Sequence, residues 1–264
     1  MRSSRTEVKP TVKKIDLNSD LGEGFGKYKL GNDEEMMKYI TSANIACGFH
    51  AGDPLIMERS VKLAIKHGVA IGAHPGFPDL MGFGRREIKV TTEEVRDYVI
   101  YQVGALLAFV RTLGGNMQHV KPHGALYNIA CQDYKIAHAI ARAVYDVDKE
   151  LILVGLSNSQ ILKAGRKVGL KVASEAFADR TYMQDGSLLP RNVKGAVLDN
   201  VEQILDRALE IVEKGTITTV NGSKIEVEAD TICVHSDTPK SVEITKKLKE
   251  TLVRHGIKVE RMSM

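Results

Sequence analysis

Seven short apolar runs are spaced along the chain, and each ends in a cluster of polar residues that could carry chemistry. The runs with their polar ends cover residues 14–20, 43–50, 70–75, 117–123, 151–157, 172–180 and 231–237. In parallel β/α folds the ligand site lies where the strands end. This one pattern therefore predicts both a parallel β/α fold and the position of its site.

The stretches between the runs carry the start and stop signals of helices. Asp53-Pro54 predicts an N-cap followed by proline at the first helical position, and Gly68 predicts the end of that helix. Similar signals predict helices over 92–113, from Asp133 onward, from Ser157 or Asn158 to Val168, over 199–214 and over 239–255. The repeated β-α order without a long linker predicts one domain over 13–257, with 258–264 as a tail.

One segment departs from the β-α order. Residues 216–228 alternate in polarity around Asn221-Gly222, which is typical of a β-hairpin with a type I′ turn. We therefore expect an antiparallel hairpin inserted before the seventh strand.

The polar residues within the runs lie on one face of their strands. Asp16, Asn18 and Asp20 share one face, with Ile15 and Leu17 on the other, and His119, Lys121 and His123 also share a face. A sheet covered by helices on both sides would prefer apolar residues on both faces. We therefore expect an irregular seven-stranded parallel β/α barrel, similar to a TIM barrel, in preference to a doubly wound sheet.

Composition limits the classes of partner. The chain has 264 residues and a net charge of +4, and residues 1–14 hold five basic residues against one acidic residue, which accounts for the whole excess. We expect residues 1–12 to be a disordered basic leader and the rest to offer no nucleic-acid face. No stretch is long and apolar enough for a signal peptide or a membrane span, so a cytoplasmic protein is expected. Cys47, Cys131 and Cys233 are too far apart in sequence for a zinc knuckle.

Two runs contain carboxylates inside apolar sequence, where an unpaired charge is costly. Asp16, Asn18 and Asp20 could accept protons or bind a cation or hydroxyl groups, although short polar side chains also stabilise turns. Glu175 and, shortly after it, Asp179 could act as a base, and Arg180 could bind an anion.

Four of the eight histidines lie at the ends of different predicted strands: His50, His74, His123 and His235. Converging imidazoles can bind a metal or transfer protons. No H-x-x-x-H pair is present, so the residues favour a non-metal role and leave the metal unknown. His67 and His255 each precede a helix-ending glycine, where they complement the helix dipole.

A lysine inside a strand needs an anionic partner, and Lys121 is such a residue. A substrate carboxylate or phosphate would serve, and so would a salt bridge to Asp16 or Glu175. The predicted catalytic residues are thus Asp16, His50, His74, His123 and Glu175. The predicted substrate-binding residues are Asn18, Asn44, Lys121, Arg180 and His235.

Long blocks of this sequence resemble one known family. The blocks at 16–23, 44–53, 72–79, 120–127, 175–180, 186–191 and 233–237 are similar, in order, to the LamB/YcsF family, and the resemblance spans about residues 13–256. It implies a β/α barrel of the glycoside hydrolase and deacetylase type. It also implies the A-subunit role of an ATP-dependent 5-oxoprolinase, which opens the lactam of 5-oxoproline to L-glutamate. ATP, with Mg²⁺, would be the co-substrate, and subunits B and C the partners.

The predicted site suits that chemistry. A lactam is an unactivated amide, and phosphorylating its oxygen would require cations for the phosphate, a base for water and an acid for the ring nitrogen. Lys121 and Arg180 would bind the anion, with Asp16 or Glu175 as the base. The alternatives are a metal-dependent deacetylase or carbohydrate hydrolase using the same strand-end site, and a non-catalytic binding protein within the complex. Whether a divalent metal occupies this site and whether the chain forms a homo-oligomer are left open.

Overall fold

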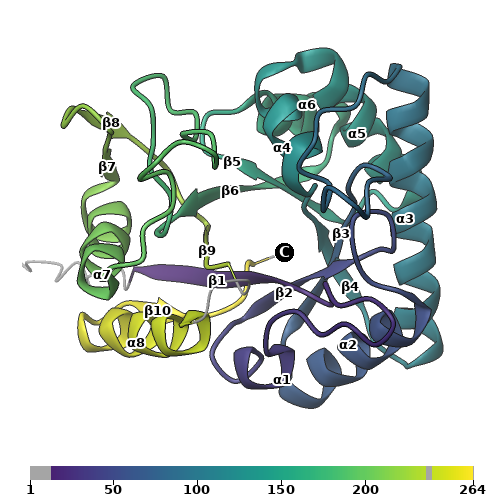
Figure 1. Ribbon diagram of the computed structural model, residues 1–264, viewed down its shortest axis with the longest axis horizontal. Coiled ribbons are helices and arrows are strands. Elements are labelled where there is room, and N and C mark those ends of the chain that lie inside the picture. Colours follow the sequence, from purple (N-terminus) through teal and green to yellow (C-terminus); the bar gives the residue numbers. More distant parts are fainter. Residues whose placement is uncertain (1–12, 236–239, 264) are drawn as a thin grey trace, which may run out of the picture.

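The computed structural model describes residues 13–235 and 240–263 and contains a closed parallel barrel (Figure 1). Strand β1 pairs with β2 on one side and with β9 on the other, which closes the barrel and confirms the predicted fold class. The seven barrel strands are β1 Lys14–Leu21, β2 Ser42–Ala46, β3 Ala70–His74, β4 Met117–Val120, β5 Ile152–Leu156, β6 Lys171–Phe177 and β9 Thr231–Cys233. The predicted leader 1–12, and Ser236 and Asp237 of the seventh run, lie outside the described residues.

Helices lie around the outside of the barrel, with the apolar core between them and the strands (Figure 1). In α2 the Asp53 side chain accepts hydrogen bonds from the backbone N–H groups of Leu55 and Ile56, and Gly68 ends the helix with φ of 67°. Thr91 and Glu94 form a capping box at the start of α3. The helices are α1 Asp33–Met36, α2 Pro54–His67, α3 Thr92–Thr112, α4 Gly124–Gln132, α5 Tyr134–Val147, α6 Gln160–Val168, α7 Val201–Leu209, the π-helical turn η1 Glu210–Lys214 and α8 Ser241–Arg254.

Two local predictions are wrong in detail. The N-cap of α6 is Ser159, because Asn158 has a left-handed φ of 63° and the Ser157 hydroxyl instead accepts a hydrogen bond from the N–H of Glu228. The hairpin of β7 Thr216–Thr218 and β8 Lys224–Glu226 is present, but its turn is not type I′. Gly222 has a positive φ and Asn221 does not, because the Asn221 side chain instead accepts hydrogen bonds within the turn.

The segment expected only as a tail closes one end of the barrel. Lys258–Val259 form β10, which pairs in parallel with the start of β1. Met262 packs inside the barrel against Ile152, Val154 and Ala173, and its carbonyl accepts a hydrogen bond from Gln118. This segment covers part of the amino end of the barrel, and the larger cavity lies at the carboxyl ends of the strands. Among the described residues, no helix combines the length and hydropathy required to cross a bilayer.

The barrel interior is packed so tightly at Gly72 that adding a single methyl group there should destabilise the protein. A Cβ at Gly72 of β3 would lie 2.1 Å from Nε2 of His119, whereas a Cβ at Gly104 of α3 would meet nothing within 4 Å. We expect Gly72→Ala to lower the free energy of unfolding by about 1–3 kcal/mol through overpacking. Gly104→Ala should raise it by about 0.5–1 kcal/mol through helix propensity. Urea denaturation of both variants measures this, and equal shifts would contradict the packing described.

Candidate active site at the carboxyl end of the barrel

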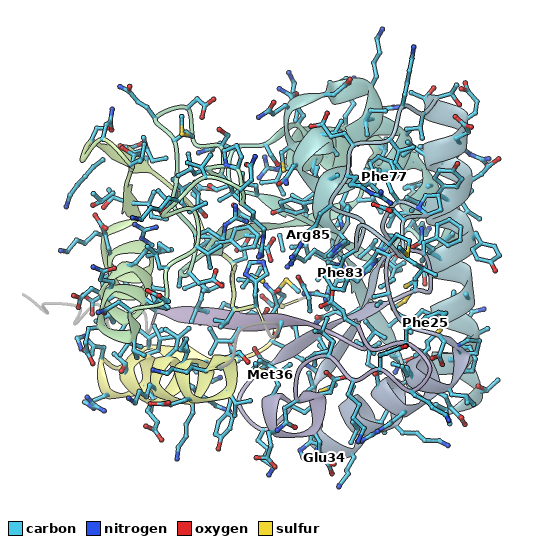
Figure 2. The ribbon with its side chains drawn as sticks, viewed as in Figure 1. Phe25, Glu34, Met36, Phe77, Phe83 and Arg85 are labelled. Atoms are coloured by element: carbon cyan, nitrogen blue, oxygen red, sulfur yellow. The ribbon has the colours of Figure 1, made fainter. Side chains whose placement is uncertain are left out.

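A cavity of about 660 Å³ lies at the carboxyl ends of the strands, and its lining combines apolar side chains with many charged ones. Phe83 and Arg85 lie next to each other at this end (Figure 2), with the guanidinium 4.9 Å from the ring centroid. The charged and imidazole side chains of the lining are Asp20, Glu23, His74, Arg85, Glu87, Lys121, His123, Arg180, Arg191 and His235.

Asp16 does not lie at this cavity. Its carboxylate accepts hydrogen bonds from the hydroxyls of Thr41, Ser42 and Thr231, at 2.5 to 2.7 Å. Burial raises its pKa to about 6, although these three hydroxyls oppose the shift. Asp16 instead lines a smaller cavity that it shares with Met262, at the closed end of the barrel.

A layer of amide and carboxylate side chains lies between Asp16 and the cavity. Asn18 donates to Glu175 at 2.9 Å and accepts from Asn44 at 2.7 Å. Asn44 in turn contacts Nε2 of His119 at 2.8 Å, and burial beside Lys121 lowers the pKa of His119 to about 3. The second oxygen of Glu175 accepts from the Tyr127 hydroxyl at 2.7 Å. Neither Asn18, Asn44 nor Glu175 lines the cavity.

Lys121 forms a buried ion cluster at the floor of the cavity. Its ammonium group lies 3.0 Å from Asp20 and 2.9 Å from Glu175, and also 3.1 Å from the sulfur of Cys233. Burial alone would disfavour the charged form, but Asp20, Cys233 and Glu175 raise the pKa of Lys121 well above its ordinary value. The salt bridge to Glu175, considered as one explanation of this lysine, is therefore present, with Asp20 as a second partner.

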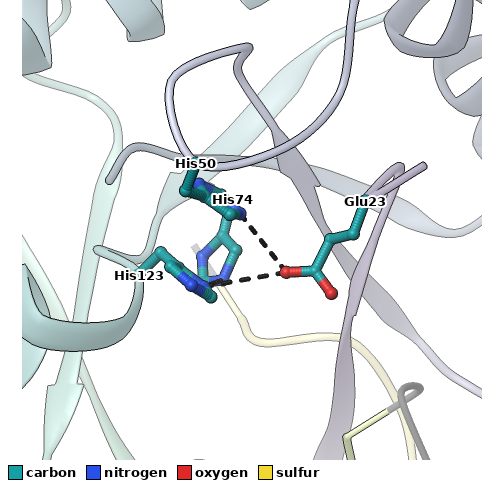
Figure 3. A group of neighbouring side chains, drawn as sticks. All are labelled: Glu23, His50, His74 and His123. Atoms are coloured by element: carbon teal, nitrogen blue, oxygen red, sulfur yellow. Dashed lines mark hydrogen bonds and ion pairs between the residues drawn. The ribbon is translucent and has the colours of Figure 1, made fainter. Parts of the chain in front are cut away.

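Three histidines and a glutamate converge on one side of the cavity (Figure 3). Nε2 of His74 and Nδ1 of His123 are 3.0 Å apart, and Glu23 lies 3.3 Å from His50 and 3.7 Å from His123. The rings of His50 and His123 are stacked, with centroids 3.7 Å apart. Ligand atoms of all four residues lie within 4.8 Å of one another, so this buried group could hold a metal ion.

A histidine oriented by a carboxylate also lines the cavity. Nδ1 of His235 lies 2.7 Å from Asp179, and its ring stacks on Phe177. Burial would raise the pKa of Asp179, but His235 and the nearby Arg191 and Arg180 lower it overall. Asp179 is therefore an anion that holds the hydrogen of His235 on Nδ1.

Arginines supply the positive charge of the cavity. Arg180 is 5% exposed and donates to the carbonyls of Leu189 and Ala196, which fixes the loop after β6. Burial and the neighbouring Arg191 lower its pKa to about 10. It therefore stays charged at neutral pH.

The structure thus places the ten predicted site residues at three depths. Five of them line the cavity: His74, Lys121, His123, Arg180 and His235. His50 lies behind His123, against which its ring stacks. The other four lie deeper in the barrel: Asp16, Asn18, Asn44 and Glu175. The ten residues do not include Glu23 and Arg85, nor Asp20 and Asp179, which were considered as chemical candidates but left out of the final set. Asp20 had a usable signal, because it shares the inward face with Asp16 and lies nearer the strand end. For Glu23 the only signal was its place just after the first strand.

Fold and site together define a β/α-barrel protein with a cation-rich, histidine-rich pocket at its strand ends. The chain belongs to the LamB/YcsF family, whose model matches residues 15–264. It is 57% identical over 249 residues to the 5-oxoprolinase A subunit of Thermococcus sibiricus, covering 94% of this chain and 98% of that one. The protein of the same name from Pyrococcus abyssi is 55% identical over 246 residues, covering 93% and 96%. The crystal structure of the lactam utilization protein from Thermus thermophilus matches with a TM-score of 0.88 at 45% identity, covering 94% and 99%.

The raised pKa of Asp16 predicts a pH-dependent stability. A carboxyl group with a higher pKa in the folded state favours folding while protonated, and loses this contribution as the pH rises through about 6. Asp16→Asn should therefore gain stability relative to the unchanged chain between pH 4 and pH 8, by roughly 3 kcal/mol, because the pKa rises from 3.8 to about 6 on folding. Urea unfolding across this range measures the difference. A constant difference at all pH values would contradict the assignment.

Proposed function

We propose that this chain is the A component of an ATP-dependent 5-oxoprolinase and that 5-oxoproline binds in the cavity at the strand ends. The assembled enzyme, with subunits B and C, would open the lactam to L-glutamate at the cost of ATP, with Mg²⁺ accompanying the nucleotide. The relatives that carry this name match nearly the whole chain. A cytoplasmic location and the identity of the partners are part of the same proposal.

The observation that carries this proposal is the charge distribution of the cavity. Arg85, Arg180 and Arg191 line it together; Arg191 and, more weakly, Arg85 lower the pKa of Arg180, so each repels the Arg180 guanidinium, whereas Asp179 attracts it. An anionic ligand relieves this repulsion, and guanidinium groups bind carboxylates with two parallel hydrogen bonds. The carboxylate of 5-oxoproline is such a ligand.

We assign the proton transfers to His235, with Asp179 as its positioning residue. Opening the ring requires water to add to the lactam carbon, the C–N bond to break, and the ring nitrogen to gain a proton. Since Asp179 holds the hydrogen on Nδ1, Nε2 of His235 can take a proton from water and then give it to the leaving nitrogen. Asp16 or Glu175 was the sequence-based choice of base, but both carboxylates are occupied by internal hydrogen bonds below the cavity.

The alternative of a metal-dependent deacetylase or carbohydrate hydrolase has less support. The relatives that match this chain at 52 to 57% identity are named as A subunits of 5-oxoprolinase. A small carboxylate ligand accounts for the three arginines that line the cavity, so a sugar substrate is not required to explain them.

The proton-transfer role predicts a loss of turnover rather than of binding. In enzyme assembled with subunits B and C, His235→Gln should reduce 5-oxoproline-dependent glutamate formation by about 10²–10⁴-fold. Asp179→Asn should also reduce kcat and should change its pH dependence, because the histidine would lose its fixed tautomer. Arg191→Gln should mainly raise KM for 5-oxoproline.

The matched control is His138→Gln, which replaces an exposed histidine of α5 away from the cavity and should leave turnover unchanged. Glutamate and ADP released by the assembled enzyme are measured together, and omission of this chain should abolish glutamate formation. Full activity of both His235→Gln and Asp179→Asn would refute the assigned roles. Glutamate formation without this chain would refute the proposed function itself.

A further inference from the structure

Two backbone carbonyls fix the tautomers of the paired histidines in the cluster of Figure 3. Nδ1 of His74 lies 2.7 Å from the carbonyl of Lys121, and Nε2 of His123 lies 2.8 Å from the carbonyl of Phe83. A carbonyl oxygen can only accept, so both of these nitrogens carry hydrogen. In the neutral rings, Nε2 of His74 and Nδ1 of His123 therefore carry lone pairs.

These two lone pairs point into a space surrounded by further acceptors. The two nitrogens are only 3.0 Å apart, and no hydrogen bond joins them while both rings are neutral. Asp20 lies 3.3 Å from Nε2 of His74, and Glu23 lies 3.7 Å from Nδ1 of His123. Nε2 of His50 is 3.3 Å from the same Glu23 oxygen. Such a set of acceptors can share a positive charge held among them.

A proton is a poor source of that charge. The rings of His50 and His123 are stacked 3.7 Å apart and nearly parallel, so protonating both would place two like charges face to face. A metal ion uses the lone pairs directly and requires no added proton.

The spacing of the ligand atoms fits one ion. Metal–ligand bonds of 2.0–2.2 Å to His and Glu place neighbouring ligand atoms about 3–3.5 Å apart. The distances of 3.0 and 3.3 Å in this cluster lie in that interval, that of 3.7 Å is close to it, and all four ligand atoms lie within 4.8 Å of one another, so a small closing movement would bring them onto one ion. The carbonyls of Lys121 and Phe83 also match the usual outer partners of metal-bound histidines, which orient the rings.

We infer that Glu23, His50, His74 and His123 bind one divalent transition-metal ion of the zinc type. Three imidazoles and one carboxylate suit zinc or a similar ion better than Mg²⁺, which prefers oxygen ligands. Because the site adjoins the cavity, the ion could polarise a carbonyl group bound there. The inference does not depend on the proposed function, since it rests on the tautomers and distances alone.

Direct metal binding tests this inference. The untagged full chain is stripped with a chelator and titrated with Zn²⁺, Co²⁺ or Mg²⁺, and bound metal is counted by elemental analysis. We expect one Zn²⁺ or Co²⁺ per chain, visible absorption bands from bound Co²⁺, and no comparable binding of Mg²⁺. His74→Gln and Glu23→Gln should each weaken Zn²⁺ binding by more than about 100-fold, beyond the usual loss for outer-shell changes.

The exposed-histidine variant His138→Gln serves as the matched control and should bind Zn²⁺ as the unchanged chain does. Circular dichroism checks that the variants fold. If they do not, X-ray absorption of the zinc-loaded unchanged chain decides, with three imidazole ligands expected. Substoichiometric binding, an oxygen-only shell, or equal affinity in the folded ligand variants would each overturn the inference.

Discussion

The buried ion cluster around Lys121 is the interaction on which the rest of the site depends. Lys121 follows β4, and its ammonium group is held by Asp20 of β1 and Glu175 of β6, so one charge ties three strands together. Removing one partner of a buried ion pair is costly, about 3–5 kcal/mol, because the remaining charge has no compensation. Lys121 is therefore better explained as the centre of the barrel's polar core than as a group reserved for substrate. Its own carbonyl then orients His74.

From the amino end to the carboxyl end of the barrel strands, the interior side chains change from apolar to polar and then to charged and imidazole groups. Met262 and its apolar neighbours fill the closed end, and Asp16 above them is surrounded by hydroxyl groups. The next layer, around Asn18 and Asn44, is bonded on all sides within the barrel. At the cavity the side chains are oriented instead by fixed outer partners, as Asp179 orients His235. The hydrogen-bonded layer beneath the cavity and the outer partners of its side chains together keep the reactive groups in place without a ligand.

The order of the seven barrel strands and of the long helices could be predicted from sequence because each run and each cap is a local pattern, whereas α1, α4 and β10 were not predicted. Parity along β1 also predicted correctly that Asp16, Asn18 and Asp20 share the inward face. Parity says nothing about depth, however. Four residues of strand span about 13 Å, which separates Asp16 at the closed end from Asp20 at the cavity. Partners from distant segments could not be chosen either, as for Asp179 and His235, which are 56 residues apart.

The charges of the cavity also fit the ring-opening step of the proposed reaction. Opening 5-oxoproline converts one carboxylate into two carboxylates and an ammonium group, so a new negative charge develops at the former lactam carbonyl. Arg180 remains charged throughout, because its pKa of about 10 is still well above neutral pH. It therefore acts as a fixed positive charge and leaves proton transfer to imidazole. Asp179 stays ionised, because His235 and Arg180 both lower its pKa. The arginines thus stabilise the product and the dyad together.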